Sequence, residues 1–293
     1  MLTKYAITFG KNCRGQIVTQ AKSWAEMLRV PYIPRTDSMS LEMMLAYYDV
    51  EGFLIATTQG PRIFTKSGTF FFHPGMGALR WKQLFHQEKI VKVDMDKFAG
   101  NKKETVVPES SCRLSYTYDQ LPDHFAVATQ LCPGQRYLDC TLGLGADALI
   151  ASHIVGKTGK VVGLEASLLL HFVVSRGLKN YATPYEDLAA DLQRLETYHT
   201  EALPFLQNQP ADSFDVIYFD PMFRFPVKTS NTMQPLRPLA YEQPLTAIVV
   251  KEALRVAPRV VIKERGEKIL RVLGCTEFLG GKYSRVKFGI AYR

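Results

Sequence analysis

The sequence predicts an α/β protein: a doubly wound, mostly parallel sheet with helices on both faces, preceded by a smaller α/β domain. Two observations lead to this prediction. Strand-like and helix-like apolar patterns alternate from residue 113 to residue 293, as expected of a doubly wound sheet. Residues 94–110 read DMDKFAGNKKETVVPES, a polar stretch typical of a connection. We therefore expect an N-terminal α/β domain at 1–95, a linker at 96–112 and the larger domain at 113–293.

The N-terminal domain is expected to consist of short elements separated by Gly-Pro and Ser-Gly turns. Apolar residues at helical spacing and short β-branched or aromatic runs distinguish its helices from its strands. The expected elements are a strand at 5–9, a helix at 17–30, a helix that opens at Ser40, strands at 53–58, 62–65 and 69–72, and a helix at 78–89.

The larger domain is expected to alternate strands and helices. Strands are expected at 136–140, 160–164, 195–199, 214–220 and 259–263, helices at 146–155, 168–180 and 249–256, and a final strand or strand pair at 283–292. Ligands of such sheets bind at the carboxyl ends of the strands, so the residues that follow each strand are the candidate site.

The composition indicates an ordinary folded protein, with 46% hydrophobic and 22% charged residues. The chain has neither an apolar run of the ~20 residues that cross a bilayer nor the apolar core of a signal peptide, so we expect a cytoplasmic protein with no membrane partner. The cysteines are odd in number and never spaced as C-x-x-C, so we expect neither disulfides nor a metal site. They are Cys13, Cys112, Cys132, Cys140 and Cys275.

The net charge of +8 is concentrated toward the end of the chain. From Pro221 to Arg293 there are 14 lysines and arginines but five acidic residues. A basic surface attracts polyanions, because neutralised phosphates release counterions. RNA is therefore the expected partner, and a solvated helix face and tail is the alternative explanation of the same charges.

A glycine-rich loop, LDCTLGLGADA, follows the first strand of the larger domain. Its two glycines let the backbone turn tightly and approach a ligand, and the next helix offers free N–H groups. The candidate cofactor-binding residues in this loop are Asp139, Thr141, Gly143, Gly145, Ala146 and Asp147. An ordinary strand-to-helix turn is the alternative.

The second strand ends at Glu165, 22 residues after Gly143. A carboxylate at this place accepts the hydroxyls of a ribose, whether the cofactor is NAD or S-adenosylmethionine. Asp139 and Asp147 suit a cofactor with cationic amino and sulfonium groups and would repel a pyrophosphate. S-adenosyl-L-methionine is therefore the expected cofactor, and helix capping is the alternative role of Glu165.

The third strand is followed by Glu201 and Ala202, where an acid or a backbone N–H can meet an adenine edge. An acid at a helix N-terminus explains this position equally well.

The fourth strand ends in DPMF at residues 220–223. The lone pair of an exocyclic amine on a nucleobase is delocalised into the ring, so acceptors must hold its N–H groups and orient that lone pair. Asp220 and the carbonyl of Pro221 can serve as these acceptors, and Phe223 can stack on the base, worth roughly 1–3 kcal/mol. The alternative is a plain strand end with Phe223 in the core.

The segments LDCTLGLGADA, DPMF and VVIKERG occur in the order typical of one family. They resemble the S-adenosylmethionine-dependent methyltransferases that include the small-subunit rRNA guanine-N2 methyltransferase J, over about residues 138–292. FHPGM at 72–76 resembles a branch with an extended N-terminal domain. Arginine is the family's residue at the position of Ala146, and often at that of Ala166, so the chain departs from the pattern at both.

The resemblance implies a class I (Rossmann-like) methyltransferase fold and transfer of methyl to an exocyclic amino group, with guanine N2 of small-subunit rRNA as the expected target. The cofactor contacts that it implies are Ala146, Asp147, Glu165, Ala166, Glu201, Ala202 and Asp220. A tRNA or a protein amide is an alternative substrate. An NAD-dependent oxidoreductase and a noncatalytic RNA-binding protein are alternatives of other classes.

Further polar residues admit two interpretations each. His73 is interpreted as structural, with catalysis or RNA binding as the alternative. Lys263, Arg265 and Lys268 either contact phosphate near the site or form a solvated face, and Lys102 and Lys103 of the linker are less informative. The N-terminal domain is expected to help bind RNA.

Overall fold

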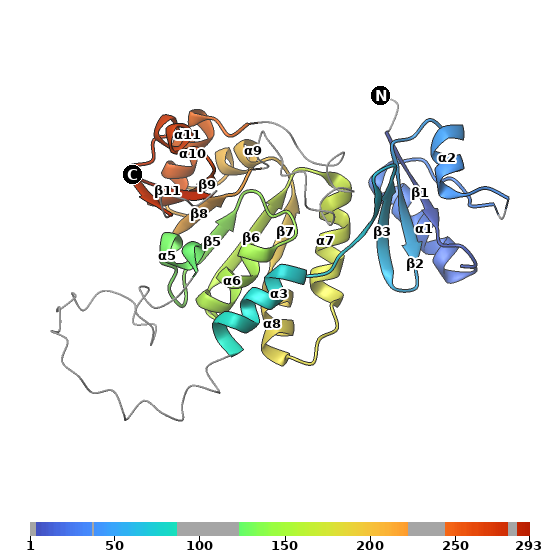
Figure 1. Cartoon of the computed structure of the whole chain (residues 1–293), viewed down its shortest axis with the longest axis horizontal. Coiled ribbons are helices and arrows are strands. Elements are labelled where there is room, and N and C mark those ends of the chain that lie inside the picture. Colours follow the sequence, from blue (N-terminus) through green and yellow to red (C-terminus); the bar gives the residue numbers. More distant parts are fainter. Residues whose placement is uncertain (1–3, 37, 87–122, 222–243, 281–285) are drawn as a thin grey trace. The chain divides into compact units, whose positions relative to one another are not determined.

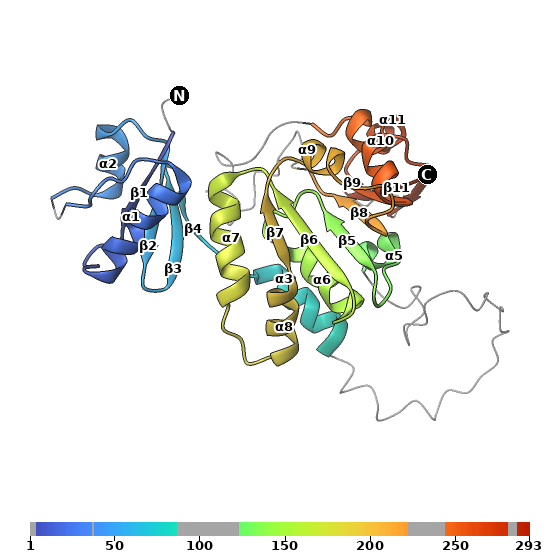
Figure 2. The ribbon, with the colours of Figure 1, turned by 180° about the vertical axis from the view of Figure 1, so that it is seen from behind.

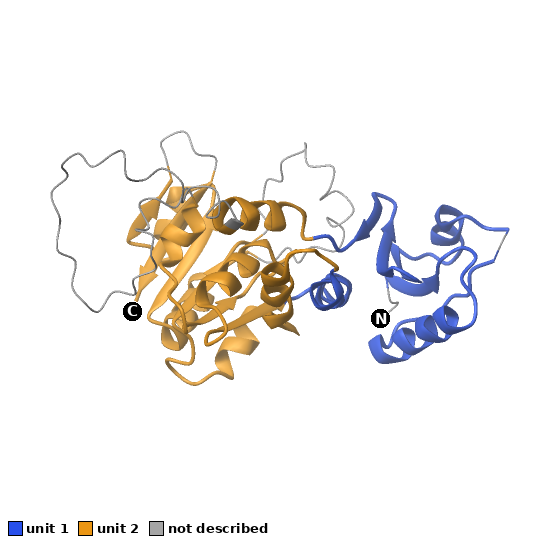
Figure 3. Cartoon of the chain, turned by 90° about the horizontal axis from the view of Figure 1, so that it is seen from below, with its two compact units in different colours: residues 1–73, 165–181, 222–243 blue, residues 74–164, 182–221, 244–293 orange. Residues whose placement is uncertain are grey.

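The structure, a computed structural model, describes residues 4–36, 38–86, 123–221, 244–280 and 286–293. It divides into two compact units, which are coloured separately in Figure 3. Unit 1 comprises residues 1–73, 165–181 and 222–243, and unit 2 comprises residues 74–164, 182–221 and 244–293. The predicted linker at 96–112 lies outside the described residues, and within them the first boundary falls between His73 and Pro74.

Unit 1 is built on a four-stranded sheet in the order β1-β2-β3-β4, in which β1 is parallel to β2 and the other pairs are antiparallel. Its elements are β1 (Tyr5–Phe9), α1 (Gln16–Leu28), α2 (Leu41–Tyr47), β2 (Gly52–Thr57), β3 (Gly60–Thr65), β4 (Gly68–Phe71) and α7 (Leu168–Asn180). The predicted strands and the two predicted N-terminal helices are confirmed, and their bounds differ from the predicted ones by at most two residues. Ser40 caps α2, since its hydroxyl accepts a hydrogen bond from the Met43 N–H at 3.2 Å.

Helix α7 packs within unit 1 through aromatic side chains. Trp24 of α1 lies edge-to-face against Phe172 of α7, with ring centroids 5.0 Å apart. Phe72 sits on the bare backbone of Gly177, where an added Cβ would lie only 2.1 Å from Cγ of Phe72. The helix is therefore part of the packing of unit 1, although it follows a strand of the larger sheet in sequence.

The larger sheet has seven strands in the order β10-β11-β9-β8-β5-β6-β7 (Figure 1). They are β5 (Arg136–Asp139), β6 (Lys160–Glu165), β7 (Glu196–His199), β8 (Val216–Phe219), β9 (Arg259–Glu264), β10 (Glu277–Leu279) and β11 (Lys287–Tyr292). Strand β5 is parallel to β6 and β8, β8 is parallel to β9, and β11 and β10 are added antiparallel. This mostly parallel sheet confirms the predicted fold class.

The order of these strands reverses beside β5. The chain runs from β5 outward to β6 and β7, and then returns to β8 on the other side of β5. Such a reversal opens a crevice between the loops at the carboxyl ends of the two central strands, which is where doubly wound proteins bind ligands.

Helices flank the sheet on both sides (Figures 1 and 2). They are α3 (Gly75–Trp81), the π-helical turn η1 (Lys82–His86), α5 (His124–Thr129), α6 (Ala146–Val155), α8 (Glu186–Arg194), α9 (Ala202–Gln207), α10 (Ala247–Val256) and α11 (Glu267–Val272). Alternate strand residues face opposite sides. Leu138, Ile217 and Ile262 join the buried core with Val250 of α10, whereas the buried Tyr137 and Tyr218 pack their rings against Phe125 of α5.

Helix α3 begins earlier than the predicted helix at 78–89. Pro74 precedes it with φ −65°, a backbone angle that suits a helix start, and the helical backbone continues through η1 to His86. Residues 87–89 lie outside the described residues. The indole of Trp81 donates a hydrogen bond at 2.7 Å to Asp191 of α8, a buried carboxylate that also contacts His153 of α6. This carboxylate therefore links α3 to α6 and α8 within unit 2.

No helix within the described ranges is long and apolar enough to span a membrane.

Candidate active site

The loops that follow β5 and β8 are joined through a threonine. Asp139 is the last residue of β5, and its Oδ1 accepts a hydrogen bond from the Thr141 N–H at 2.9 Å. The hydroxyl of Thr141 in turn accepts one from the Asp220 N–H at 2.6 Å. Asp220 lies just beyond β8, so its N–H is free of the sheet ladder and available for this contact. The predicted residues Asp139, Thr141 and Asp220 are thus brought together at the topological switch.

The glycine loop turns from β5 into α6 through left-handed backbone. Gly143 has φ 52°, and Gly145 has φ 75° and forms the N-cap of α6. L-residues with a side chain rarely adopt such angles. Among the described residues other than its chain neighbours, the nearest atom to a Cβ added at Gly143 is the Thr141 carbonyl oxygen, at 3.8 Å. The described residues therefore do not block the approach of a ligand to this part of the backbone.

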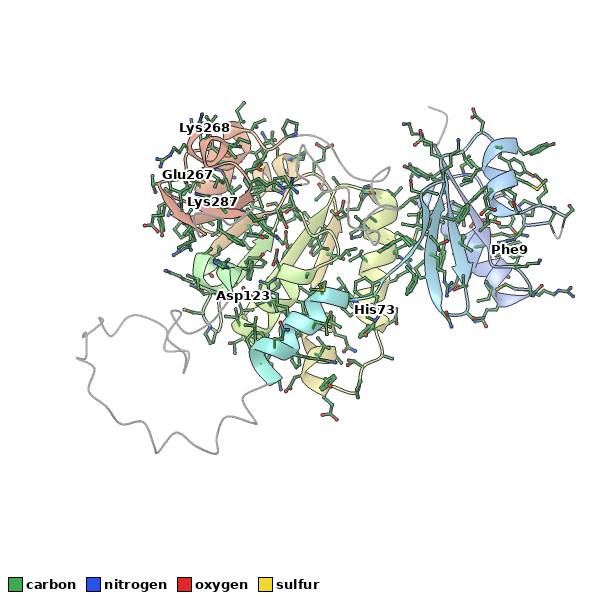
Figure 4. The ribbon with its side chains drawn as sticks, in the orientation of Figure 1. Phe9, His73, Asp123, Glu267, Lys268 and Lys287 are labelled. Carbon is green, nitrogen blue, oxygen red and sulfur yellow. The ribbon has the colours of Figure 1, made fainter. Side chains whose placement is uncertain are left out.

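Asp147, in the first turn of α6, is the centre of a buried group of charges. Its Oδ2 accepts a hydrogen bond from the Tyr218 hydroxyl at 2.8 Å, and its Oδ1 pairs with the guanidinium of Arg80 from α3. Arg80 also pairs with Asp123, the N-cap of α5 marked in Figure 4, and the Nη2–Oδ1 distance is 2.8 Å. Asp147 is thereby held from two sides.

Lys263 places a cation between two carboxylates. It lies near the carboxyl end of β9, and its Nζ is 2.7 Å from Oδ2 of Asp220 and 3.6 Å from Oδ2 of Asp147. Its side chain is 25% exposed, so water weakens these contacts less than on an open surface. Lys263 belongs to the site and not to a solvated face.

Burial and these charges set the protonation of the site. Burial raises the pKa of Asp220 to about 6, with Asp147 adding to the rise and Lys263 opposing it. Burial also raises the pKa of Asp139 well above its usual range, which favours the neutral acid. The pKa of Asp147 is lowered, because Lys263 and Arg80 together outweigh the effect of burial.

The pKa of Lys263 is raised. Burial alone would lower it, but the charges of Asp147 and Asp220 outweigh burial and keep the ammonium protonated. The site therefore contains an ionised Asp147, a charged Lys263 and an Asp220 that titrates near neutrality.

The other predicted site residues lie at the ends of β6 and β8 and at the start of α9. Glu165 is buried as the last residue of β6, and its Oε1 accepts a hydrogen bond from the Ser167 N–H at 2.8 Å. Glu201 is the exposed N-cap residue of α9, and its side chain makes no capping hydrogen bond. Their contacts with a cofactor, together with those of Ala166 and Ala202, stay predictions. Pro221 is partly buried beside Asp220, and Phe223 lies outside the described residues.

Ala146 adjoins a glycine of α3. A Cβ on Gly77 would lie 3.0 Å from Cα of Ala146, so α3 and α6 approach each other closely here. The close approach brings Arg80, one turn further along α3, to Asp147. Ala146 is therefore a packing position, and its predicted cofactor contact stays a prediction.

Sequence reasoning did not find Arg80 and Tyr218 as site residues. Tyr218 is in a buried apolar strand, and nothing in its pattern distinguishes a hydrogen-bonding tyrosine from one in the core. For Lys263 a signal existed: a lysine directly after the apolar run VVI is unusual for a buried strand and indicates a paired charge.

Three further candidates, His73, Lys268 and Arg265, lie within the described residues. His73 is exposed, and its Nε2 is 3.3 Å from the Tyr181 hydroxyl within unit 1. Lys268, marked in Figure 4, is exposed on α11. Arg265 follows β9, and its N–H donates a hydrogen bond at 2.6 Å to Oε1 of Glu264. Among the residues that the structure describes, no three His, Cys, Asp or Glu side chains group as a metal site.

These features define a class: a doubly wound domain with a glycine loop, an acid at each central strand end, and the anionic side chain of Asp147 just after that loop. A family model described as "Putative SAM-dependent methyltransferase" matches residues 124–277. The chain belongs to this family of S-adenosylmethionine-dependent methyltransferases, whose cofactor is S-adenosyl-L-methionine.

Two curated relatives show how far the similarity extends. The chain is 33% identical over 246 residues to the "Uncharacterized protein YpiP" of Bacillus subtilis (strain 168), covering 84% of this chain and 82% of that protein. It is 29% identical over 155 residues to ribosomal RNA small subunit methyltransferase J of Pseudomonas fluorescens (strain Pf0-1), covering 51% of this chain and 58% of that protein. The second match therefore spans little more than half of the methyltransferase J chain.

A solved structure supports the fold. The SAM-dependent methyltransferase NGO1261 from Neisseria gonorrhoeae superposes with a TM-score of 0.54 at 15% identity, covering 98% of this chain and 95% of that one. At this identity the likeness concerns the fold alone.

The observed loop fits the cofactor. Apart from its chain neighbours, no described residue comes closer than 3.8 Å to a Cβ placed at Gly143, so the described residues leave room for a ligand close to this backbone. The three acids Asp123, Asp147 and Asp220 outnumber the two cations that pair with them, Arg80 and Lys263, which leaves negative charge to attract a sulfonium.

Proposed function

We propose that the protein transfers a methyl group from S-adenosylmethionine to an exocyclic amino group of a nucleobase, with guanine N2 of small-subunit rRNA as the target. The observation that carries the proposal is the state of Asp220. Its N–H is fixed by Thr141 and its Oδ2 by Lys263, while Oδ1 has no hydrogen-bond partner among the described residues. A fixed carboxylate with one available oxygen suits an amine N–H.

The chemistry that the cofactor supplies when bound is a methyl group on a sulfonium: an N–C bond forms as the S–C bond breaks, and the nitrogen is left with one proton to lose. In this proposal Asp220 accepts an amine N–H and, with a pKa of about 6, is mostly ionised at neutral pH and able to take that proton. The carbonyl of Pro221 accepts the second N–H. Positioning supplies most of the rate.

The proposed contacts of the cofactor follow the strand ends. The backbone of the glycine loop and Asp147 would hold its methionine part, Glu165 the ribose, and Glu201 the adenine edge. Phe223 would stack on the base.

RNA is the proposed partner, and similarity to a protein named for ribosomal RNA supports this choice. Unit 1 offers a basic surface cavity of about 380 Å³, lined by Lys11, Arg14 and Arg35 next to Phe9, which Figure 4 marks. No salt bridge involves these three cations among the described residues. We propose that unit 1 helps bind the RNA backbone through them.

A change of Asp220 tests the reaction. Asp220→Ala is expected to lower methyl incorporation into unmethylated small-subunit rRNA by about 100-fold or more, because the acceptor of the amine is lost. Radiolabelled cofactor measures the rate, and calorimetry measures cofactor binding. Lys157→Ala, at an exposed residue of the turn between α6 and β6, is the matched control and keeps the normal rate.

Normal methylation by an Asp220→Ala protein that still binds cofactor would refute this role. Mass-spectrometric mapping of rRNA in cells with and without the protein then identifies the target. An unchanged rRNA profile would overturn the rRNA assignment in favour of a tRNA or a protein amide.

A further inference from the structure

Lys263 lies between two carboxylates near the end of β9. Its ammonium lies 2.7 Å from Oδ2 of Asp220 and 3.6 Å from Oδ2 of Asp147. We propose that Lys263 is a positioning residue for methyl transfer: it binds one oxygen of Asp220, keeps that carboxylate ionised, and so leaves the other oxygen aimed at the target amine. This inference rests on the proposed function.

The neighbours of Asp147 explain why the ammonium lies closer to Asp220. Asp147 already receives the Tyr218 hydroxyl at 2.8 Å and the guanidinium of Arg80. Arg80 is itself bound on its other side by Asp123. Each oxygen of Asp147 already accepts one of these hydrogen bonds, and the short hydrogen bond of Lys263 goes to Asp220. The charges alternate in sign from Asp123 through Arg80, Asp147 and Lys263 to Asp220.

The backbone fixes both ends of the Lys263–Asp220 contact. In the parallel ladder Phe219 of β8 lies beside Ile262 of β9, so the residues that follow them, Asp220 and Lys263, are neighbours at one edge of the sheet. The Asp220 N–H is bound to Thr141 at 2.6 Å. With its N–H and Oδ2 both bound, the Asp220 side chain has little freedom to rotate.

Other charges around Asp220 oppose its ionisation. Asp147 of α6 and Glu264 of β9 are acids that raise its pKa, and burial raises it further. Asp139 of β5 and Tyr218 of β8 also interact electrostatically with it, and Arg80 of α3 acts on the Lys263 ammonium. Lys263 is the cation bound directly to Asp220 within the described part of the chain. Its removal should therefore raise the pKa of Asp220 above about 6.

Removal of the Lys263 charge should lower the activity most at acidic pH. An acceptor carboxylate must be ionised, so activity falls as the pH falls through the pKa of Asp220. When Lys263 is replaced by a neutral residue, the acidic limb of the pH–rate profile moves to higher pH. When arginine replaces it, the charge remains but the guanidinium has a different shape and reach. Arginine should preserve the pKa and disturb the position.

A titration of Asp220 tests the inference without any substrate. The full-length protein is labelled with [4-13C]aspartate, the signal of Asp220 is assigned with Asp220→Asn, and its midpoint is measured by NMR. We expect a midpoint near 6 in the native protein, a rise of about one unit or more in Lys263→Met, and little change in Lys263→Arg. An unchanged midpoint in a folded Lys263→Met protein would overturn the inference.

Kinetics provide the second readout. At neutral pH Lys263→Met should lower kcat by about tenfold or more, with little change in KM for the cofactor and partial recovery at higher pH. Lys263→Arg should keep the native pH profile but have a reduced kcat. If Lys263→Met does not fold, Lys263→Arg decides, and a native kcat in that variant would overturn the positioning role.

The two proposals fail in different ways. If the native protein transfers methyl to RNA but the titration midpoint of Asp220 is unchanged in Lys263→Met, only the role of Lys263 is refuted. If the midpoint rises as expected in Lys263→Met but the native protein methylates no RNA, the contact between Lys263 and Asp220 is supported and the RNA substrate is refuted.

Discussion

Thr141 joins the two loops on which the proposed chemistry depends. Its N–H and hydroxyl face Asp139, and the same hydroxyl oxygen accepts the Asp220 N–H at 2.6 Å. One small side chain thus fixes the backbone of the acceptor carboxylate relative to the glycine loop. Catalytic geometry is sensitive to errors of about 1 Å, so this link should matter for rate as well as for stability.

Replacing Thr141 by valine keeps the shape and removes the oxygen. The Asp220 N–H would lose its partner at a partly buried place, which should lower the free energy of unfolding by about 1–3 kcal/mol. Methyl transfer should fall about tenfold or more, because Asp220 is no longer held. Thr141→Ser, which keeps the hydroxyl, is the control. Denaturant unfolding and initial rates measure both effects, and a serine variant as impaired as the valine variant would contradict this account.

Single residues differ in how well the sequence predicts them. Asp139, Thr141 and Asp220 could be predicted to meet, because they follow strands whose order along the sheet is typical of the fold. Arg80 could not, because its two partners are 43 and 67 residues away in sequence and no local pattern records such a contact. Lys263 was detectable as a charge, but its choice of Asp220 depends on tertiary packing.

Helix α7 shows the same limit at the scale of an element. Its apolar spacing predicts a helix at 168–180, which the structure confirms. The pattern does not indicate that its Gly177 receives the ring of Phe72 from the N-terminal part of the chain. Strand β10 and helices α5, α8, α9 and α11 were not predicted either. All of them except the nine-residue α8 are three to six residues long, which is too short for a periodic signal.

The contact at Gly177 predicts an unusual sign for a helix substitution. Glycine to alanine inside a helix normally stabilises by about 1 kcal/mol. Here the added Cβ would lie 2.1 Å from Phe72, so Gly177→Ala should instead destabilise by about 1–3 kcal/mol. In a Phe72→Ala background the same substitution should be neutral or stabilising. Urea unfolding of the four proteins tests this, and a stabilising Gly177→Ala in the native background would contradict the packing.

At the scale of the whole molecule, charge separates into two kinds. The charges around Asp147 are largely buried and paired, and they should respond weakly to salt. Lys11 and Arg14 are exposed, and Arg35 is half-buried, around the cavity of unit 1. Cations of this second kind can exchange their counterions for phosphates.

Neutralising the cavity should therefore weaken RNA binding in a salt-dependent way. The triple variant Lys11→Gln, Arg14→Gln and Arg35→Gln should bind a single-stranded RNA less tightly, with the slope of log affinity against log salt reduced by about 2. Fluorescence anisotropy across a salt series measures it. A control neutralises Lys22, Arg29 and Lys66, which are exposed in the same unit but do not line the cavity. Equal losses in both variants would refute a specific role for the cavity.

The chain has two tryptophans, and each belongs to a different unit. Trp24 is buried against Phe172 in unit 1, and Trp81 is buried in unit 2 with its indole bonded to Asp191. The protein therefore carries a built-in optical reporter for each unit. With Trp81→Phe the remaining emission follows unit 1, and with Trp24→Phe it follows unit 2. Comparing their melting curves would show whether the two units unfold in one cooperative step or separately.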